Sequence, residues 1–381
     1  MIEVSNRLHT VKEYYFSKKL KEVRKLISEG SQVINLGIGS PDLPPNNSVI
    51  EALKNSLLDL NAHKYQSYQG LPELRYAISN FYKRNYEVSL NPENEILPLM
   101  GSKEGIMHIS MAYLNEGDSV LIPNPGYPTY NSVAKLIGAN TIFYDLTAEN
   151  KWHPDIDKLQ SQDLSKVKLM WINYPHMPTG AVADIKRIES LIKFTSKHNI
   201  LLVNDNPYSF ILNDKPQSIF NFEGSNKCCL ELNSLSKTFN MSGWRVGMLS
   251  GAKSHIQNVL KVKSNMDSGM FYGVQKGAIE ALNTTSDWLN NLNQIYEKRR
   301  SLVWQLASQL DCKYDNKASG MFVWAKLLNG VDSEKFTDNL LNDKHIFVAP
   351  GTVFGSNGKG YVRFSLCADE NIINEALKRT K

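Results

Sequence analysis

The chain contains 381 residues, of which 42% are hydrophobic and 21% are charged, as in ordinary globular proteins. Its length exceeds the size at which one hydrophobic core stops growing, so we expect two lobes. The formal net charge of +5 comes from 43 basic and 38 acidic residues spread along the chain without a basic block, which argues against nucleic acid as a partner. No stretch approaches the roughly 18 apolar residues of a membrane span, so we expect no membrane partner.

Cysteine usage predicts a reducing compartment. Cys228 and Cys229 are adjacent within a probable strand, and Cys312 and Cys367 stand far from them. This pattern suits reduced core thiols better than a disulfide framework or a metal site. The N-terminus lacks the apolar segment of a secretory signal. We therefore predict a cytoplasmic protein without a bound metal.

The first ninety residues are expected to form three helices and one short strand. The helices are predicted over residues 11–29, 47–60 and 72–86, and the strand over residues 33–36. The strand runs into residues 37–42, G-I-G-S-P-D, a turn without bulky side chains that can approach a ligand closely. On residue types alone, this turn could equally be no more than a tight connection.

The middle of the chain alternates between strands and helices, which predicts a mostly parallel sheet covered by helices on both faces. We expect strands over residues 96–100, 119–123, 141–146, 167–172, 200–204, 228–232 and 245–250, and helices over residues 102–114 and 184–198. In such sheets, ligands bind beyond the carboxyl ends of the strands. Asp205, which follows an apolar strand, and Tyr208 are therefore candidate site residues, although Asp205 could simply cap the following turn.

The last third of the chain is expected to form a smaller α+β lobe. Residues 263–271 are predicted to be a linker between the lobes, followed by a helix that ends near residue 282 and a long helix over residues 287–310. The smaller lobe is predicted to contain strands over residues 321–325 and 361–366 and helices over residues 333–341 and 369–378. Arg363 occupies an alternating position of the last strand, where a surface arginine is the ordinary explanation.

Lys237 is the strongest candidate for chemistry in the chain. It lies in residues 234–247, S-L-S-K-T-F-N-M-S-G-W-R-V-G, in a loop predicted between two strands. Ser234, Ser236 and Arg245 supply hydroxyls and a guanidinium that can grip a phosphate, and a neighbouring cation disfavours protonation of the lysine. A neutral amine can form a Schiff base with a carbonyl compound. The alternative, a solvated surface lysine, does not explain these neighbours.

Two further turns could bind an anion or a ring. Residues 101–105, G-S-K-E-G, turn a strand into a helix whose N-terminus offers free backbone N–H groups to a phosphate. Ser102 could instead act only as a helix N-cap. Prolines on either side of Tyr127 in residues 124–130, N-P-G-Y-P-T-Y, fix the direction of its ring, although a single aromatic residue is more often part of the packing.

The stretch 234–247 resembles the lysine loop of the class I/II aminotransferases, the fold-type-I enzymes that use pyridoxal 5′-phosphate. The resemblance includes the lysine, the serine three residues before it and the arginine eight residues after it, and further segments match the family in order from residue 37 to residue 363. It implies an α/β fold with a mostly parallel seven-stranded sheet between layers of helices and a smaller α+β domain. The expected domains are an N-terminal segment joining the small domain over residues 1–46, a large cofactor-binding domain over residues 47–283 and a C-terminal small domain over residues 284–381.

The resemblance also implies three catalytic residues. Lys237 would hold the cofactor as a Schiff base and move the substrate proton. Asp205 would pair with the protonated ring nitrogen, and Tyr208 would hydrogen-bond the ring hydroxyl. The ring of Tyr127 would stack on the cofactor ring.

The remaining roles implied by the resemblance concern the cofactor phosphate and the substrate. The phosphate would be bound by Gly101, Ser102, Lys103, Ser234 and Arg245. Tyr65, five residues before Gly70, would reach the phosphate of the other subunit in a homodimer, although a tyrosine at a helix entry is usually part of the core or its rim. Gly39 and Arg363 would bind the substrate α-carboxylate.

One position departs from the family pattern. In residues 173–180, N-Y-P-H-M-P-T-G, Met177 stands where the family has an asparagine that donates to the ring oxygen of the cofactor. A thioether cannot donate a hydrogen bond, so the ring oxygen would retain Tyr208 as its partner. We hypothesise that the Schiff base therefore gives up its proton less readily than in typical relatives.

The sequence therefore predicts an aminotransferase that moves an amino group between an amino acid and a 2-oxo acid. The G-S-K-E-G turn and residues 264–269, S-N-M-D-S-G, most resemble the subgroup that contains LL-diaminopimelate aminotransferase. A β-carbon–sulfur lyase on the same scaffold is the alternative, because it would use the same cofactor residues. A cofactor-binding transcription regulator is disfavoured, because no length remains for a DNA-binding module. We identify no arginine for a side-chain carboxylate, so a dicarboxylate preference has no support in the sequence.

Overall fold

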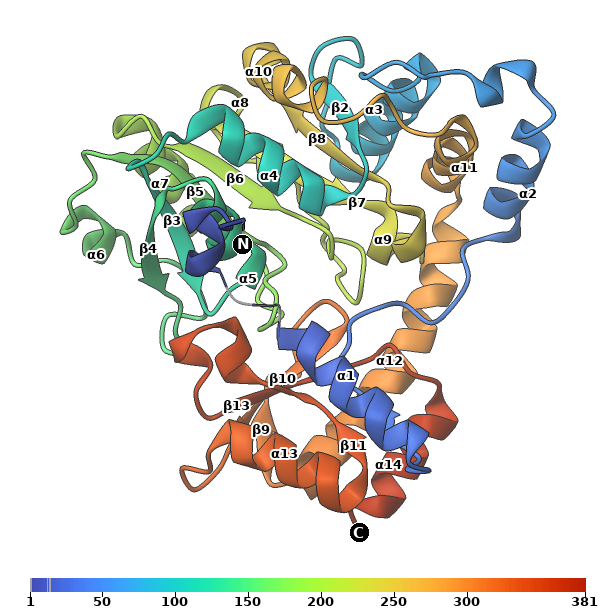
Figure 1. The fold of residues 1–381 in the computed structure, drawn as a ribbon, viewed down its shortest axis with the longest axis vertical. Coiled ribbons are helices and arrows are strands. Elements are labelled where there is room, and N and C mark those ends of the chain that lie inside the picture. The colour runs from blue at the N-terminus through green and yellow to red at the C-terminus, as the bar shows by residue number, and fades with distance from the viewer. Residues whose placement is uncertain (1, 12, 14) are drawn as a thin grey trace.

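A seven-stranded sheet forms the centre of the larger domain in the computed structural model, which describes residues 2–11, 13 and 15–381 (Figure 1). Its strands are β2 (Ile96–Leu99), β3 (Ser119–Asn124), β4 (Asn140–Asp145), β5 (Val167–Ile172), β6 (Leu201–Asp205), β7 (Cys229–Ser234) and β8 (Gly247–Gly251). They lie in the order β2-β8-β7-β6-β5-β3-β4, and β8 is antiparallel to both neighbours whereas the other pairs are parallel. The predicted mostly parallel sheet is confirmed, and the predicted strand bounds agree within two residues.

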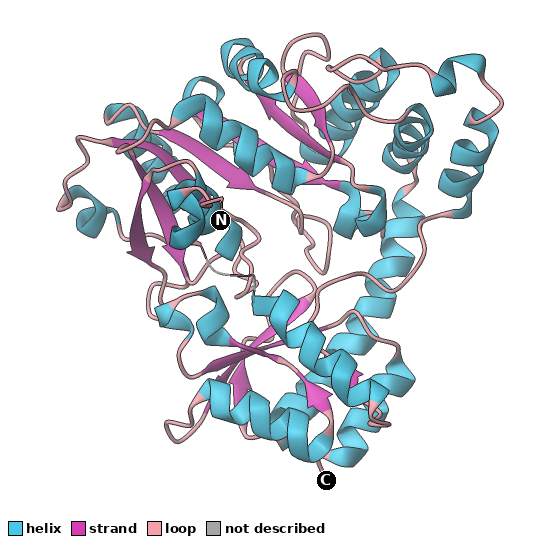
Figure 2. Ribbon diagram, viewed as in Figure 1, coloured by secondary structure: helices cyan, strands magenta, loops and turns pink. Residues whose placement is uncertain are grey.

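Side chains at alternate strand positions enter hydrophobic cores on opposite faces of this sheet. In β5, Leu169 and Trp171 belong to one core, and Met170 and Ile172 belong to the other, because successive side chains of a strand point to opposite faces. The first face is covered by α4 (Ser102–Tyr113), α5 (Pro128–Leu136) and α10 (Lys253–Lys263), and the second by α7 (Ile185–Lys197), α3 (Pro72–Tyr86) and α11 (Tyr272–Asn283) (Figure 2). The sheet is therefore buried on both sides, as predicted.

A four-stranded antiparallel sheet forms the smaller domain. Its order is β12 (Ala349–Pro350), β13 (Tyr361–Ser365), β10 (Phe322–Leu327) and β9 (Cys312–Tyr314), and it packs with α13 (Ser333–Lys344) and α14 (Glu370–Arg379). The N-terminal segment joins this domain, because α1 (Tyr15–Ser28) packs on its core and β1 (Ile34–Asn35) pairs in parallel with β11 (Ile346–Phe347). The helix predicted over residues 11–29 corresponds to α1, and its positions 12 and 14 lie outside the described residues.

One long helix, α12 (Ser286–Gln309), runs from the larger domain to the smaller one, close to the predicted range 287–310 (Figure 1). Residues 264–271 instead join α10 to α11, which both pack on the larger domain, so the predicted linker between the lobes at 263–271 is wrong. Composition alone does not distinguish a loop within a domain from one that crosses a boundary. We propose the domain ranges 1–46, 47–283 and 284–381, because α11 ends just before the crossing helix begins.

The other helical elements are short. α2 (Asn47–Ser56) ends before the predicted residue 60, and the 3₁₀ turn η2 (Leu60–His63) follows it. The remainder are η1 (Asn6–Thr10), α6 (Ile156–Gln160), η3 (Ile219–Asn221), α8 (Ser225–Cys228), α9 (Leu235–Thr238), η4 (Ser242–Trp244), η5 (Gly351–Phe354) and η6 (Ser356–Gly358). Within the described ranges, no helix combines the length and the apolar character needed to cross a membrane.

Candidate active site

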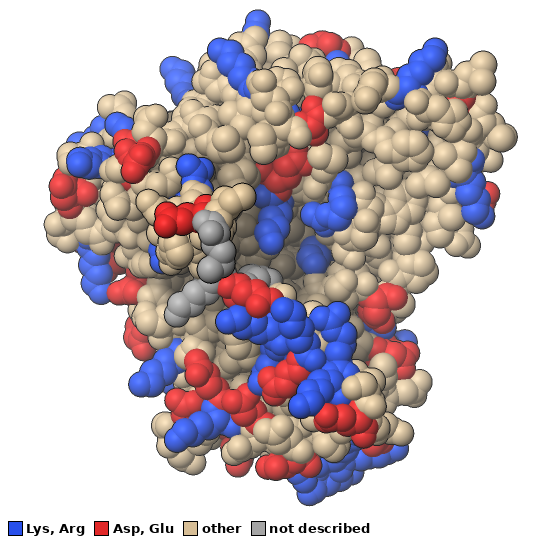
Figure 3. All heavy atoms as spheres, viewed as in Figure 1, with Lys and Arg blue, Asp and Glu red and all other residues tan. Residues whose placement is uncertain are grey.

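A cavity of about 740 Å³ lies between the two domains, beyond the carboxyl ends of β5, β6 and β7. Figure 3 shows a hollow at this level, with Lys and Arg side chains inside it and along its lower rim. Ten of the predicted site residues line the cavity: Gly39, Ser102, Lys103, Tyr127, Asp205, Tyr208, Ser234, Lys237, Arg245 and Arg363. The position is the one at which parallel sheets bind ligands.

Lys237 reaches this cavity from a single helical turn, α9, and not from the irregular loop that the sequence predicts. The turn forms because the hydroxyl of Ser234, the last residue of β7, accepts a hydrogen bond from the Ser236 N–H at 3.1 Å. Lys237 Nζ donates to the backbone oxygen of Gly39. Burial lowers the pKa of Lys237 to about 8, and two nearby arginines act in the same direction. The amine is therefore more readily neutral than an ordinary lysine, as a nucleophile requires.

One end of the cavity is suited to an anion. Ser102 begins α4, so the free N–H groups of this helix lie beside the cavity. Gly101 has a φ of +89°, and an added Cβ would overlap the guanidinium of Arg245, whereas at Gly247 it would lie 2.6 Å from the Ser102 nitrogen. Burial and the neighbouring Arg245 lower the pKa of Lys103. The cations of Lys103 and Arg245 lie close together, and Gly101 and Gly247 leave room beside them because they have no Cβ. This arrangement fits a phosphate.

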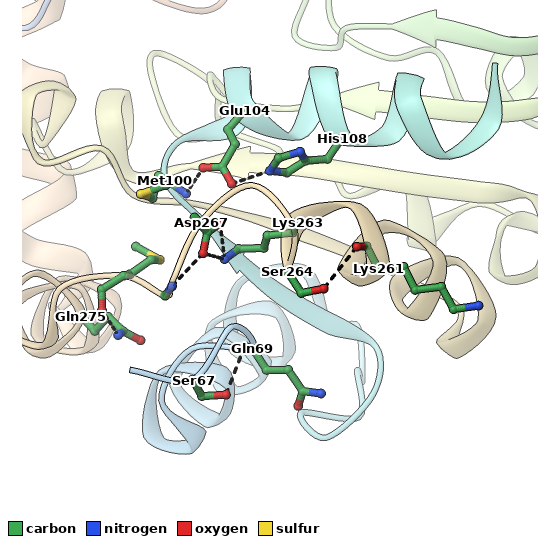
Figure 4. A network of polar contacts seen from close by, with 12 residues as sticks. Ser67, Gln69, Met100, Glu104, His108, Lys261, Lys263, Ser264, Asp267 and Gln275 are labelled. Atoms are coloured by element: carbon green, nitrogen blue, oxygen red, sulfur yellow. Dashed lines mark hydrogen bonds and ion pairs between the residues drawn. The ribbon is translucent and has the colours of Figure 1, made fainter. Parts of the chain in front are cut away.

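Behind the anion-binding end, polar side chains of α4 lie close to Asp267, in the segment that joins α10 to α11 (Figure 4). Glu104 Oε1 lies 2.7 Å from His108 Nε2, and Asp267 forms a 2.8 Å ion pair with the buried Lys263. Oxygen and nitrogen atoms of Glu104, His108 and Asp267 lie within 4.8 Å of one another. Because the Lys263 ammonium already brings a positive charge to this cluster, we do not interpret it as a metal site.

A buried carboxylate, that of Asp205, lines the cavity, and one of its acceptor atoms is unpartnered in the described part of the chain. Asp205 Oδ2 accepts a hydrogen bond from Tyr130 at 2.8 Å, whereas Oδ1 is buried and has no hydrogen-bond partner among the described residues. The amide of Asn173 donates to the Asp205 backbone oxygen. Burial raises the pKa of Asp205 to about 6. An unpartnered buried carboxylate oxygen fits the protonated ring nitrogen of pyridoxal 5′-phosphate.

Two tyrosines of the predicted site lie near this carboxylate. Tyr127 directly precedes α5, and its ring meets that of Tyr130 edge-on at 5.6 Å. Tyr208 follows β6 and packs edge-on against Phe322 at 5.8 Å. Burial raises the pKa of Tyr208, so its hydroxyl stays protonated and can donate a hydrogen bond. Both rings line the cavity.

Arg363 lies on β13 at the side of the cavity formed by the smaller domain, and it is 4% exposed. Its Nη2 donates to the Gly37 backbone oxygen at 2.7 Å, and its Nη1 lies 3.4 Å from Met177 Sδ. The ring centres of Phe322 and Phe354 lie 3.9 and 4.7 Å from its guanidinium carbon. Aromatic faces at this distance attract and orient a guanidinium. Such a buried, oriented cation fits a carboxylate ligand and rules out the ordinary surface arginine.

Two predicted site residues, Gly101 and Tyr65, do not line the cavity: Gly101 directly precedes Ser102, which does, whereas Tyr65 lies away from the cavity of its own chain. Tyr65 is 91% exposed and lies between η2 and α3. Its predicted role needs a second subunit and stays a prediction.

Sequence reasoning missed four residues that contact the predicted ones. They are Tyr130, Asn173, Phe322 and Phe354. Two of them had a usable signal, because Tyr130 stands one helical turn after a predicted ring and Asn173 follows a predicted parallel strand. Nothing in the spacing of the two phenylalanines connects them with a distant arginine.

Comparisons with known proteins agree with this geometry. A model of the family described as aminotransferase class I and II matches residues 31–379. The LL-diaminopimelate aminotransferases of Halothermothrix orenii and Aquifex aeolicus are 38% and 36% identical to the chain over 100% of its length and 98% and 99% of theirs. The solved structure of substrate-bound BacF from Bacillus subtilis has a TM-score of 0.96 at 36% identity, covering 100% of this chain and 97% of that one.

Proposed function

Because the chain belongs to the class I and II aminotransferases, which are pyridoxal 5′-phosphate-dependent enzymes that transfer amino groups, we propose that the cavity between its domains is the active site for exchange between an amino acid and a 2-oxo acid. One observation carries the assignment of this site. A buried lysine with a lowered pKa, two cations beside the N-terminus of α4 and a carboxylate with an oxygen unpartnered by any described residue line the same cavity.

The residues divide the work by their chemistry. Bound pyridoxal 5′-phosphate supplies a ring that withdraws electrons from the substrate's α-carbon. Ser102, Lys103 and Arg245 would bind its phosphate. Asp205 Oδ1 would accept a hydrogen bond from its protonated ring nitrogen. Lys237 Nζ would bind the aldehyde as a Schiff base and, when displaced by the substrate amine, act as the base that moves the α-proton.

The substrate would be held by its α-carboxylate. Arg363 is the proposed clamp, because its guanidinium is buried, oriented by aromatic rings and within the same cavity as Lys237. The Gly39 segment would close the other side of the carboxylate, since its backbone already contacts Lys237. With the carboxylate and the amine both fixed, the α-hydrogen is presented to the lysine.

A panel of amino donors and 2-oxo acceptors, followed at the absorbance of the bound cofactor, tests this function. The panel includes LL-diaminopimelate, because the most similar relatives reported above are named for it. Transfer that requires both a donor and an acceptor is expected. A holoenzyme whose spectrum responds to no donor in the panel would contradict the proposed function.

The β-carbon–sulfur lyase alternative is not favoured, because the matched curated relatives are named as LL-diaminopimelate aminotransferases. Pyruvate release from cystathionine distinguishes the two reactions, since a lyase needs no 2-oxo acid. We expect release to be slower than amino transfer to the best acceptor.

A cytoplasmic location remains part of the proposal. Its support is that Cys228, Cys229, Cys312 and Cys367 are all free thiols, as expected in a reducing compartment. Fractionation of cells that express the full chain would test it.

We further propose a homodimer in which Tyr65 completes the site of the partner. Leu58, Leu60 and Tyr65 are 86%, 83% and 91% exposed, and Met266 and Phe271 lie on the neighbouring loop. This loop adjoins the Tyr65 segment, because Tyr272 donates to Asp59 at 3.0 Å. An exposed apolar surface of this kind is typical of a subunit interface.

Aspartate at both Leu58 and Leu60 is expected to convert the dimer to a monomer and to weaken cofactor binding. The charges would be buried without partners in the interface. Light scattering measures the mass, and Ile372→Asp on α14, an exposed apolar position of the smaller domain, is the control. A wild-type protein that is monomeric at working concentration would contradict the dimer.

Replacing Met177 by asparagine is expected to lower the pH midpoint of the holoenzyme's absorbance change by about one unit. Met177 lines the cavity, and its sulfur cannot donate a hydrogen bond to the deprotonated form. Asparagine supplies that donor and stabilises the deprotonated form, so the proton leaves at lower pH. Tyr208→Phe removes a donor and should move the midpoint upward. An unchanged midpoint in Met177→Asn would contradict the hypothesis.

A further inference from the structure

The hydroxyl of Tyr130 holds one of the two oxygens of Asp205. Tyr130 lies in the first turn of α5, is 1% exposed and donates to Asp205 Oδ2 at 2.8 Å. Its ring stacks on Trp171 of β5, with the centroids 4.9 Å apart and the planes 5° from parallel. A buried ring stacked in this way has few other orientations available. The hydroxyl is therefore held in place from the side of the sheet.

Tyr130 is always the donor of this hydrogen bond. Burial raises the pKa of Tyr130 well above its ordinary value, and the charge of Asp205 acts in the same direction. The phenol thus keeps its proton at every pH at which the protein would be assayed. The negative charge of the pair lies on the carboxylate.

Asp205 needs this donor because its other surroundings oppose the charged form. Burial disfavours the carboxylate, and Glu231 on the neighbouring β7 adds to this effect. Glu231 accepts hydrogen bonds from the hydroxyls of Tyr82 and Ser218. Tyr208 is protonated and therefore brings no charge to Asp205. The hydrogen bond from Tyr130 lowers the pKa of Asp205 and so opposes burial.

We propose that Tyr130 is a positioning residue for amino transfer, which fixes Asp205 so that Oδ1 alone remains to bind the ring nitrogen of the cofactor. The inference rests on the proposed role of Asp205. Tyr130 acts through Asp205. The orientation of the Asp205 carboxylate is then set by α5 and β5 and not by the cofactor. A carboxylate fixed before binding loses little freedom when its ligand arrives.

Tyr130→Phe removes the hydroxyl and keeps the stacked ring. We expect kcat to fall about 10- to 100-fold, as for loss of a hydrogen bond to a charged group, while KM for the amino acid changes less than about threefold. Two further readouts do not depend on turnover. The dissociation constant of the cofactor should rise, and the ¹⁵N resonance of a labelled ring nitrogen should move towards the neutral form.

Tyr144→Phe is the matched control. Tyr144 is also a buried tyrosine that contacts Trp171, because its hydroxyl donates to the Trp171 backbone oxygen at 2.6 Å. Its loss removes a buried hydroxyl of the same kind without touching Asp205. The control should change thermal stability. It should leave the ring-nitrogen resonance unchanged, and it should not lower kcat more than it changes KM.

The outcomes separate this inference from the proposed function. A resonance and a cofactor affinity that are unchanged in Tyr130→Phe, or changed equally in Tyr144→Phe, overturn the inference while an active wild type keeps the function. An inactive wild type overturns the function itself.

If Tyr130→Phe does not fold, Tyr130→3-fluorotyrosine keeps the ring and has a more acidic hydroxyl. The Asp205 carboxyl should then titrate at lower pH in the apoprotein, and an unchanged titration overturns the inference.

Discussion

Replacing Lys237 by alanine is expected to lower amino transfer by about 10⁴-fold or more while the protein still binds its cofactor. The amine is needed twice, as the nucleophile that binds the aldehyde and as the base that moves the proton. Lys103 also lines the cavity, but it lies beside Arg245 at the anion-binding end and cannot take over. Steady-state rates measure the loss, and borohydride treatment followed by mass spectrometry should attach the cofactor to the wild type alone.

The pH dependence of aldehyde capture by the apoprotein provides a second readout of Lys237. Only the neutral amine attacks, and the pKa of about 8 means that its fraction rises about tenfold per pH unit below 8 and levels off above it. The capture rate should follow this curve. A rate that climbs with the same slope up to pH 9.5 would show an ordinary lysine and contradict the assignment.

Lys261→Ala is the control for the loss of a lysine as such. Lys261 lies on the exposed face of α10, and Figure 4 shows its side chain pointing away from the polar side chains of α4. Its replacement should leave rate and labelling unchanged. Amino transfer retained in Lys237→Ala, with labelling at another lysine, would remove the proposed mechanism.

The strands of the large sheet could be predicted because burial on both faces leaves a distinct pattern in the sequence. Residues 167–172 are almost continuously apolar, and β5 has those bounds. Pro72 at the first helical position sets the start of α3 in the same local way. The error at residues 263–271 has a different origin. Whether that loop crosses between domains depends on where α11 packs, which no local pattern records.

The candidate site was predictable to the extent that its residues stand at strand ends and glycine turns. Asp205 and Ser234 each end a parallel strand, so topology alone brings them to one edge of the sheet. The contacts that tune these groups come from elsewhere in the chain. Tyr130 precedes Asp205 by 75 positions, and the rings around Arg363 come from β10 and η5. Such pairs arise from tertiary packing, for which one sequence holds no spacing rule.

Replacing Arg363 by lysine is expected to lower kcat/KM for amino acids about 10²- to 10³-fold. Lysine keeps the charge but loses the planar fork that binds both carboxylate oxygens. It also loses the hydrogen bond to Gly37 and the stacking on Phe322 that hold the group in place. Each hydrogen bond to a charged group contributes about 1.5–3 kcal/mol, so the loss of one or two accounts for the expected factor.

An amine that lacks a carboxylate distinguishes substrate clamping from general damage to the site. Its slow reaction with the holoenzyme should be nearly equal in the wild type and in Arg363→Lys, because it never used the clamp. Phe322→Leu keeps the guanidinium and removes one ring, so it should lower kcat/KM for amino acids only about 3- to 10-fold. If Arg363→Lys slowed the carboxylate-free amine as much as the amino acid, the arginine would support the fold of the site and the α-carboxylate would be bound elsewhere.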